Sequence, residues 1–584
     1  MAVAKSESDE KSSIIRPLGH MERYQFHMLH LKFLGGTIVS CRYDIPPPLA
    51  TADSHDRIVE YVEDALARVV IEHPALRLVA VKADTKRPAW VAVNQLDLAH
   101  HVQWVDCSSS SSGDEAGDGG GGDAVVSQET LRARIERCLD ESYAHVKEGP
   151  QWCVVILFKS RGDPFLDIIF DYSHAIGDGM SGKIFHESLL RTLNNASATI
   201  ATTSTAPAPA LSNHILAIPP TARTLEPPVE KAGKFSVSPG FALSTVWKEL
   251  RPPKLSSTSA AQAHWAPIRA TPYRTHFRAF DIPWAALSQI QTACRSHKTT
   301  ITGLLHALVV VSMATHIPAD QATAFASCSP LDLRRHLVDS PEAKRLGFDP
   351  RRTIANYVTA MRHKFPADMV GEMRAVAAKG SQNQSRKQNG PVNGDGDGQQ
   401  HASQDPDAEL VALVWRCAAR VRAELLKRVD GGLKNDIASL MGLVPDWRAQ
   451  HRSDAQKPRP NSFVVTNLGV LDGGESESTT TTPTVVTAAV KDGKEGEGED
   501  THDATGPGAG SETEKDQTEN WKITHSTFAI STEVNGAAFQ VSPISVKDGA
   551  MCVGCSWQDC VVGLELAEVI VADMERWLLF LGRS

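Results

Sequence analysis

The sequence predicts an α/β protein of two domains, and three observations support this fold class. Its 584 residues, 41% of them apolar, are enough for a sizeable buried core and too many for one ordinary core. Patterns typical of helices alternate with patterns typical of buried strands in both halves of the chain. A proline-rich stretch from Pro219 to Pro253 lies near mid-chain, where the chain can cross between two halves.

Helices are predicted where apolar residues recur every three or four positions. Residues 58–72 show this pattern, and His73-Pro74 stops it. Short apolar runs bounded by turn residues indicate strands instead, as at 166–172, which follows a Gly-Asp-Pro turn. We expect further helices at 131–144, 182–193, 300–313 and 564–581, and further strands at 75–81, 154–158, 463–466 and 551–557.

Four segments are too polar, or too rich in small and turn-forming residues, to bury a core, and they are predicted to be disordered surface insertions. These insertions are residues 108–123, 196–212, 380–407 and 473–520. The predicted organisation is an N-terminal subdomain at 14–218, a proline-rich crossover at 219–272 and a C-terminal subdomain at 273–584.

Overall composition narrows the class of protein. A formal net charge of −9 and a pI near 6.2 give no basic excess that would favour nucleic acid as the main partner. Ten cysteines in so long a chain lack the dense spacing of a secreted disulfide scaffold, so we expect reduced thiols. The polar, acidic N-terminus is unlike a signal peptide, and no run of about 18 apolar residues predicts a membrane span. Together these features predict a cytoplasmic protein.

The stretch from Asp167 to Gly182, DIIFDYSHAIGDGMSG, says most about chemistry. An apolar strand runs into His174, then a short loop with Asp178 and Gly179, then a helix. Glycines beside the aspartate allow backbone angles and close approaches that a Cβ would block. A histidine held at the end of a buried strand can act as a neutral base, because its unperturbed pKa is about 6.5. The alternative is a structural histidine, since His-x-x-x-Asp-Gly also occurs by chance in long chains.

Four segments, in this order, give the sequence a resemblance to a known family. They are Arg16-Pro17-Leu18-Gly19 with Glu22-Arg23-Tyr24, Ser173 to Gly179, Pro330-Leu331-Asp332-Leu333-Arg334, and Val464-Val465-Thr466-Asn467-Leu468-Gly469. The set resembles the fungal alcohol acetyltransferase family, within the superfamily of coenzyme A-dependent acyltransferases that carries the His-x-x-x-Asp-Gly motif. The resemblance covers the chain from Arg16 to Leu581 apart from the insertions.

The resemblance implies two similar chloramphenicol-acetyltransferase-like domains with an active-site tunnel at their interface. His174 would be the general base that takes a proton from the acceptor, which then attacks the thioester of acetyl-CoA directly. Acetyl-CoA, or another acyl-CoA with a short acyl group, would be a co-substrate, with no covalent acyl-enzyme, no tightly bound cofactor and no metal.

The resemblance also implies supporting roles around the base. Asp178 would turn away from substrate and hold the loop by pairing with an arginine. Arg334 is the candidate for this arginine; the alternative is that Arg334 is a surface residue. Gly179 would be needed for the conformation of the backbone. Asn467 is a candidate hydrogen-bond donor to the developing oxyanion or to substrate, and otherwise a turn residue before Gly469.

The leading functional hypothesis is an O-acetyltransferase that acts on a small-molecule alcohol, with ester biosynthesis in secondary metabolism as its setting. One alternative is a condensation-type or N-acyltransferase with an amine acceptor or a carrier-bound acyl donor. The doubled histidine common in condensation domains is absent, because Ser173 precedes His174. The other alternative is a non-catalytic family member that binds acyl-CoA without turnover.

Two further features are predicted to be structural. Cys552-x-x-Cys555 with Cys560 has no evident fourth ligand nearby, so no zinc site is expected. The resemblance allows peripheral contact with the endoplasmic reticulum or lipid droplets through residues 24–34 and 564–581. Residues 564–581 carry four acidic side chains against one arginine, which favours packing on the core over contact with an anionic membrane.

Overall fold

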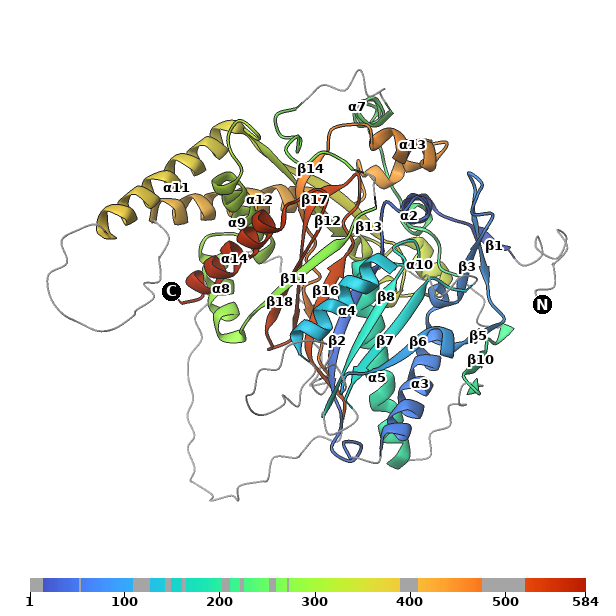
Figure 1. The fold of residues 1–584 in the computed structure, drawn as a ribbon. Coiled ribbons are helices and arrows are strands. Elements are labelled where there is room, and N and C mark those ends of the chain that lie inside the picture. The colour runs from blue at the N-terminus through green and yellow to red at the C-terminus, as the bar shows by residue number, and fades with distance from the viewer. Residues whose placement is uncertain are drawn as a thin grey trace, which may run out of the picture.

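The computed structural model describes residues 14–51, 54–108, 127–141, 149–159, 164–201, 211–220, 225–250, 259–269, 272–388, 408–474 and 520–583. Most of each predicted insertion lies outside these residues, namely 109–123, 202–210, 389–407 and 475–519. Figure 1 shows two large sheets next to each other, with helices packed around them. Both halves therefore mix helices and strands, as the sequence predicted.

The first large sheet carries the candidate active-site strand at its centre. Its strand order is β16 (Lys522–Ile530), β2 (Thr37–Asp44), β8 (Phe165–Tyr172), β7 (Trp152–Phe158) and β6 (Val102–Asp106). Apolar side chains of α3 (His55–Glu72) and α5 (Gly179–Ala201) pack on one face. The helix α4 (Gln128–Glu141) covers the other face. Because β8 is covered on both faces, all eight of its residues are buried.

The second large sheet has seven strands among the described residues. Its order is β11 (Thr275–Ile282), β18 (Met551–Gln558), β17 (Ala537–Val546), β14 (Asn461–Val465), β12 (Phe325–Asp332) and β13 (Val358–Phe365), with β15 (Val470–Leu471) paired to β17. Five helices cluster beside it: α8 (Trp284–Ser296), α9 (Ile301–His316), α11 (Ala367–Gln388), α12 (Ala408–Asp430) and α14 (Leu564–Leu581). Their apolar faces and the sheet form a second core.

The remaining elements are short and lie around these two layers. Two small sheets have the orders β1 (Ile14–Pro17), β4 (Ala89–Ala92), β3 (Leu78–Val81) and β5 (Gln95–Asp97), β10 (Ile215–Ala217), β9 (Leu211–Ser212). The other helices are α2 (His20–His30), α6 (Val229–Ala232), α7 (Pro239–Leu250), α10 (Pro341–Leu346) and α13 (Trp447–Asp454).

One strand departs from the simple division of the chain at residue 273. The strand β16 belongs to the predicted C-terminal subdomain, yet it pairs antiparallel with β2 in the first sheet. The next two strands along the chain, β17 and β18, lie in the second sheet. The C-terminal half of the chain therefore contributes a strand to the first sheet. In the strand order of that sheet, β16 is two positions from β8, the strand that leads to the predicted base.

Three predicted boundaries are corrected by the structure. Residues 75–81 were expected to be one strand, but a 3₁₀ turn, Pro74–Arg77, precedes β3, since proline suits the first position of a helical turn. The segment 196–212 was expected to be disordered, but α5 continues through an alanine-containing run to Ala201 and β9 begins at Leu211. Likewise, α11 extends to Gln388 into the segment 380–407, through glutamine, arginine and lysine residues that favour helix.

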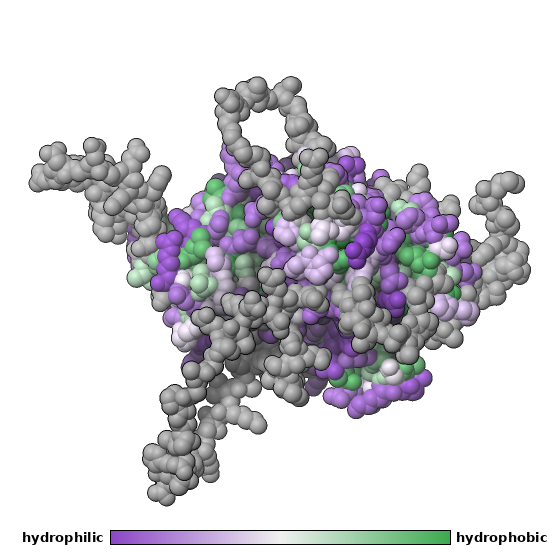
Figure 2. All heavy atoms as spheres, turned by 90° about the horizontal axis from the view of Figure 1, so that it is seen from below, coloured by the Kyte–Doolittle hydropathy of each residue, from purple (hydrophilic) through white to green (hydrophobic). Residues whose placement is uncertain are grey.

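The C-terminal helix packs on the protein body. The helix α14 buries its apolar face, from Ala567 to Leu581, in the second core, as its charge pattern predicted. Within the described residues no single helix is long and apolar enough to cross a membrane; only α8 and α9 taken together are, and they are bent by 92°. Figure 2 shows apolar side chains in small groups among hydrophilic ones on the visible face.

Candidate functional site

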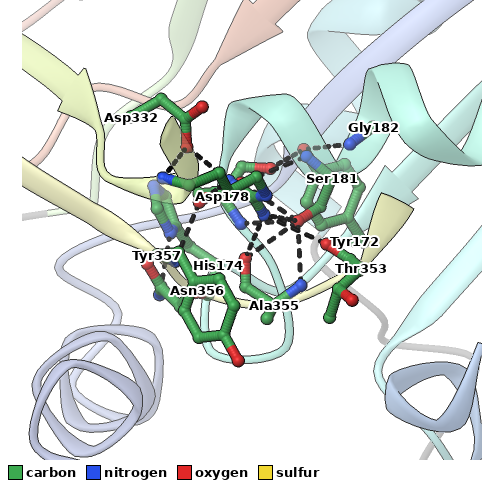
Figure 3. Close-up of polar contacts among 11 residues, drawn as sticks. Tyr172, His174, Asp178, Ser181, Gly182, Asp332, Thr353, Ala355, Asn356 and Tyr357 are labelled. Atoms are coloured by element: carbon green, nitrogen blue, oxygen red, sulfur yellow. Dashed lines mark hydrogen bonds and ion pairs between the residues drawn. The ribbon is translucent and has the colours of Figure 1, made fainter. Parts of the chain in front are cut away.

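The predicted base lies where β8 ends. Ser173 and His174 follow the last residue of this strand, and α5 begins at Gly179. The hydroxyl of Tyr172 fixes the intervening loop, because it donates to the carbonyl oxygen of Asp178 at 2.7 Å and accepts from the amide of Gly182 at 3.1 Å. A buried strand thus fixes the start of the loop, and one tyrosine joins that start to the first turn of the helix (Figure 3).

The imidazole of His174 faces residues from the other half of the chain. Asn356 Nδ2 donates to the backbone oxygen of His174 at 2.6 Å and lies 3.4 Å from its Nδ1 atom. Burial lowers the pKa of His174 below its usual value, while a hydrogen bond to its own backbone carbonyl and the charge of Asp178 act in the opposite direction. A half-buried histidine with a lowered pKa is neutral at physiological pH, which is the state a general base requires.

Asp178 and Arg334, which the sequence proposed as partners, meet in the structure. Arg334 Nη1 lies 2.7 Å from Asp178 Oδ2, and the two side chains are only 2% and 4% exposed. Asp178 also accepts hydrogen bonds from the amide of Tyr357 at 2.9 Å and the hydroxyl of Ser181 at 3.0 Å. Its carboxylate is therefore occupied by these three partners, whose contacts are drawn in Figure 3.

Arg334 ties the loop to the second half of the chain. It donates to the carbonyl oxygens of Ala355 at 2.8 Å and Thr353 at 3.2 Å, and to Asp332 Oδ1 at 2.9 Å. Burial by itself would lower the pKa of Arg334, but the charges of Asp178 and Asp332 outweigh it and the pKa is raised. The guanidinium is therefore a fixed cation, and it holds the His174 loop against residues 353–357.

Asn467 is engaged in a turn. Its Oδ1 accepts from the amide of Gly469 at 2.8 Å, and Gly469 has a φ of 71°, which suits glycine. Its Nδ2 donates to the hydroxyl of Thr302 at 3.0 Å. Among the described residues, the contacts of Asn467 join it to these neighbours rather than to His174. The oxyanion role stays a prediction.

Gly179 is required by close packing. Neither Gly177 nor Gly179 has a positive φ, so backbone angle does not explain them. A Cβ on Gly179 would lie 2.7 Å from Leu468 Cδ2 and 3.2 Å from Phe528 Cζ. The glycine allows the start of α5 to approach β16 and the loop after β14, and so helps to set the position of the His174 loop.

The variant Gly179→Ala is expected to lose about 1–3 kcal/mol of unfolding free energy, because an added methyl overpacks this contact. The measurement is the denaturant midpoint. The matched control is Gly371→Ala on α11, where a Cβ meets nothing within 4 Å, and this change should be neutral or stabilising. Equal effects of the two changes would show that the packing at Gly179 is not tight.

One group of side chains has the composition of a metal site. Donor atoms of Asp281, His525 and Cys552 all lie within 4.8 Å of one another. His525 Nε2 is already paired with Asp281 Oδ1 at 2.9 Å, and burial raises the pKa of Cys552, so its thiol is protonated. Cys555 lies on the same strand, three residues from Cys552 and hence on the opposite face. We interpret the group as an ion pair beside a buried thiol.

Sequence reasoning missed three residues of the site. Asn356 contacts His174, and Tyr357 and Ser181 bind the carboxylate of Asp178. Ser181 follows the His-x-x-x-Asp-Gly motif by two residues, so its position in the first turn of α5 was a usable signal. Asn356 and Tyr357 immediately precede β13, and an Asn-Tyr pair before a strand carries no specific indication of function.

Sequence comparisons identify similar proteins. A sequence profile of the alcohol acetyltransferase family (AATase) matches residues 133–364. A probable alcohol acetyltransferase of Fusarium pseudograminearum, FCK4, is 24% identical over 536 residues, which cover 90% of this chain and 86% of that protein. A probable alcohol acetyltransferase of Aspergillus fumigatus, crmB, is 23% identical over 554 residues, with 93% and 95% covered.

Solved structures agree on the fold. The trichothecene 15-O-acetyltransferase TRI3 of Fusarium sporotrichioides is similar with a TM-score of 0.59 at 12% identity, over 97% of this chain and 94% of that one. The starter condensation domain of rhizomide synthetase is similar with a TM-score of 0.51 at 10% identity, over 100% and 97%. The predicted fold class, a two-domain α/β protein of the chloramphenicol acetyltransferase type, is confirmed.

Proposed function

We propose that this chain, which matches the alcohol acetyltransferase profile over residues 133–364 and is similar to two probable fungal alcohol acetyltransferases, transfers an acetyl group from acetyl-CoA to the hydroxyl of a small-molecule alcohol, with His174 as general base. The similarity to these proteins supports a CoA-dependent O-acyltransferase; the donor, the acceptor and the role of His174 belong to the proposal. The observation that carries it is the neutral imidazole at the end of β8, held between two halves of the chain.

We infer which ring nitrogen reacts from the contacts of the imidazole. The imidazole is hydrogen-bonded to the backbone carbonyl of His174 itself, and Nδ1 is the ring nitrogen nearer to the backbone. A proton on Nδ1 donates to this carbonyl and leaves the lone pair on Nε2. Asn356 Nδ2 donates to the same backbone oxygen at 2.6 Å, and its 3.4 Å separation from Nδ1 is too long for a strong hydrogen bond that would compete for Nδ1. Nε2 is therefore the atom that accepts the proton of the acceptor.

The reaction then runs in one direct transfer. Nε2 takes the hydroxyl proton as the acceptor oxygen attacks the thioester carbonyl, and a carbon–oxygen bond forms. The tetrahedral intermediate collapses, the carbon–sulfur bond breaks, and the imidazolium returns the proton to the departing thiolate. The products are the acetyl ester and CoA with a free thiol, and the histidine ends in its starting state.

The buried ion pair keeps this geometry without entering the chemistry. Asp178 is occupied by Arg334, Ser181 and Tyr357, so it is not a proton acceptor for His174. Its role is to hold the loop, and the loop holds the imidazole. The names of the curated relatives support an alcohol as acceptor, and we place the reaction in ester formation in secondary metabolism.

The proposal is tested by release of free thiol from acetyl-CoA in the presence of a panel of alcohols and amines. We expect release that depends on an alcohol acceptor, with the acetyl ester identified by mass spectrometry. Amide products from amines alone would favour the N-acyltransferase alternative. Binding of acetyl-CoA without turnover by any acceptor would favour a non-catalytic family member and contradict the proposal.

A further inference from the structure

The loop between β16 and β17 holds a carboxylate that the proposed reaction does not use, that of Glu533. The loop, residues 531–536, is fixed at both ends by residues from distant parts of the chain. The amides of Ser531 and Val534 donate to the carbonyl oxygens of Gly36 and Phe33, and Gln558 Nε2 and Arg459 Nη1 donate to the carbonyl oxygens of Thr532 and Gly536. A loop held in this way places Glu533 in a defined position.

Strand register places Glu533 at the same sheet edge as His174. Ile530 of β16 pairs with Thr37 of β2, and Thr37 pairs with Tyr172 of β8. Both outer strands are antiparallel to β2, so they run in the same direction and end at the same edge. Neighbouring strands are about 4.8 Å apart, which puts the ends of β16 and β8 about 10 Å apart. Glu533 and His174 follow these ends by three and two residues.

A strand of the second sheet reaches both the surroundings of Glu533 and the His174 loop. Cys328 and Asp332 are four residues apart on one face of β12, about 13 Å along the strand. Asp332 binds Arg334, the partner of Asp178 in the His174 loop. At the other position, burial raises the pKa of Cys328 to about 12, and the negative charge of Glu533 adds to this effect. Glu533 therefore lies near Cys328. The strand face that carries Cys328 also carries Asp332, which is linked through Arg334 to the His174 loop.

The carboxylate of Glu533 lacks a cationic partner within the described part of the chain. Burial raises the pKa of Glu533 to about 7, and no charged group contributes to this shift. The residue is nevertheless half-buried rather than fully enclosed, so its surface is still accessible. By contrast, the carboxylate of Asp178 is fully buried and bound by Arg334. An unpaired carboxylate in such a place destabilises the free protein, and a ligand cation would remove this penalty.

We propose that Glu533 binds a cationic nitrogen of the acceptor alcohol, roughly 10–13 Å from the hydroxyl that His174 deprotonates. The inference rests on the proposed acyl transfer and narrows its acceptor to alcohols that carry a positive charge at the far end. The carboxylate supplies the opposite charge, and the fixed loop sets the distance. A charge pair removed from water discriminates strongly between a cation and a neutral group of the same shape.

The test compares two alcohols that differ in charge alone. The cation is (8-hydroxyoctyl)trimethylammonium, whose nitrogen cannot be acylated, and its neutral isostere is 9,9-dimethyl-1-decanol. Equilibrium binding of each is measured by calorimetry with the wild type, with Glu533→Gln and with Glu565→Gln, an exposed residue of α14. We expect the wild type and Glu565→Gln to bind the cation at least about tenfold more tightly than the isostere, and Glu533→Gln to lose this difference.

The outcomes separate this inference from the proposed function. Equal binding of the two alcohols by the wild type, including no binding of either, would overturn the role of Glu533 whether or not the variant folds. A preference that survives in Glu533→Gln would assign the charge recognition to another residue. Thiol release with neutral alcohols tests the acyl transfer by itself, so the transferase can stand when the cation site fails.

Discussion

Replacement of His174 by alanine is expected to lower the rate of acceptor-dependent thiol release by about 10²–10⁴-fold, the usual contribution of a positioned general base. The imidazole is the group at the end of β8 that is neutral, oriented by its own backbone carbonyl and adjoined by the second half of the chain. Binding of acetyl-CoA should persist, because the variant removes a proton acceptor rather than a binding surface. Single-turnover kinetics and CoA titration measure the two quantities separately.

The matched control for this variant is His264→Ala, since His264 is exposed. It should release thiol at the wild-type rate. Release by His174→Ala at a rate close to that of the control would remove His174 from its role, and the proposed mechanism would lose its base. An equal loss in both variants would point to damage unrelated to the chemistry.

Protonation of His174 is expected to determine how kcat/KM falls at acid pH. Burial lowers the pKa of His174 below 6.5, so the imidazole remains neutral as the pH falls through that value. Since a general base works in its neutral form, kcat/KM should hold its plateau below pH 6.5 and decline only at lower pH, where the ring becomes protonated. A wild-type profile that already declines as the pH falls toward 6.5 would contradict a half-buried base with a lowered pKa.

Much of the fold was predictable because its signals are local. The helices α3 and α14 each show an apolar face that repeats at helical spacing, and β8 is an apolar run beside a turn. His174 and Asp178 were found for the same reason, since one short motif contains both. The strand β16 was not predicted, because what places it is its pairing with β2, nearly 500 residues away in the chain.

The site residues differ in the same way. Arg334 is 156 residues from Asp178, and only the resemblance to a family suggested the pair. Asn356 is 182 residues from His174 and belongs to no motif, so only the folded chain reveals its contact. Glu533 is the extreme case, because an isolated glutamate in a polar loop is ordinarily a solvated surface residue. The role proposed for Glu533 depends on its burial and on the lack of a cationic partner among the described residues, and neither is visible in the sequence.

Removal of Arg334 is expected to have the largest effect on stability. Arg334→Ala leaves the carboxylate of Asp178 buried without its cation, and breaking one side of a buried ion pair destabilises a protein by about 3–5 kcal/mol. The amide of Tyr357 and the hydroxyl of Ser181 still donate to the carboxylate, so the effect should fall near the lower end of this range. Denaturant unfolding measures the free energy, and thiol release should fall with it because the loop that positions His174 loses its anchor.

Arg335→Ala is the matched control, because Arg335 is the adjacent residue and is exposed. It should change the free energy of unfolding by no more than about 0.5 kcal/mol. The double variant Asp178→Asn with Arg334→Ala should be less destabilised than the sum of the two single variants, since it leaves no unpaired buried charge. Strict additivity, or an Arg334→Ala variant as stable as Arg335→Ala, would show that the pair does not hold the loop. If Arg334→Ala instead loses both stability and turnover, the ion pair is the contact through which the second half of the chain positions His174.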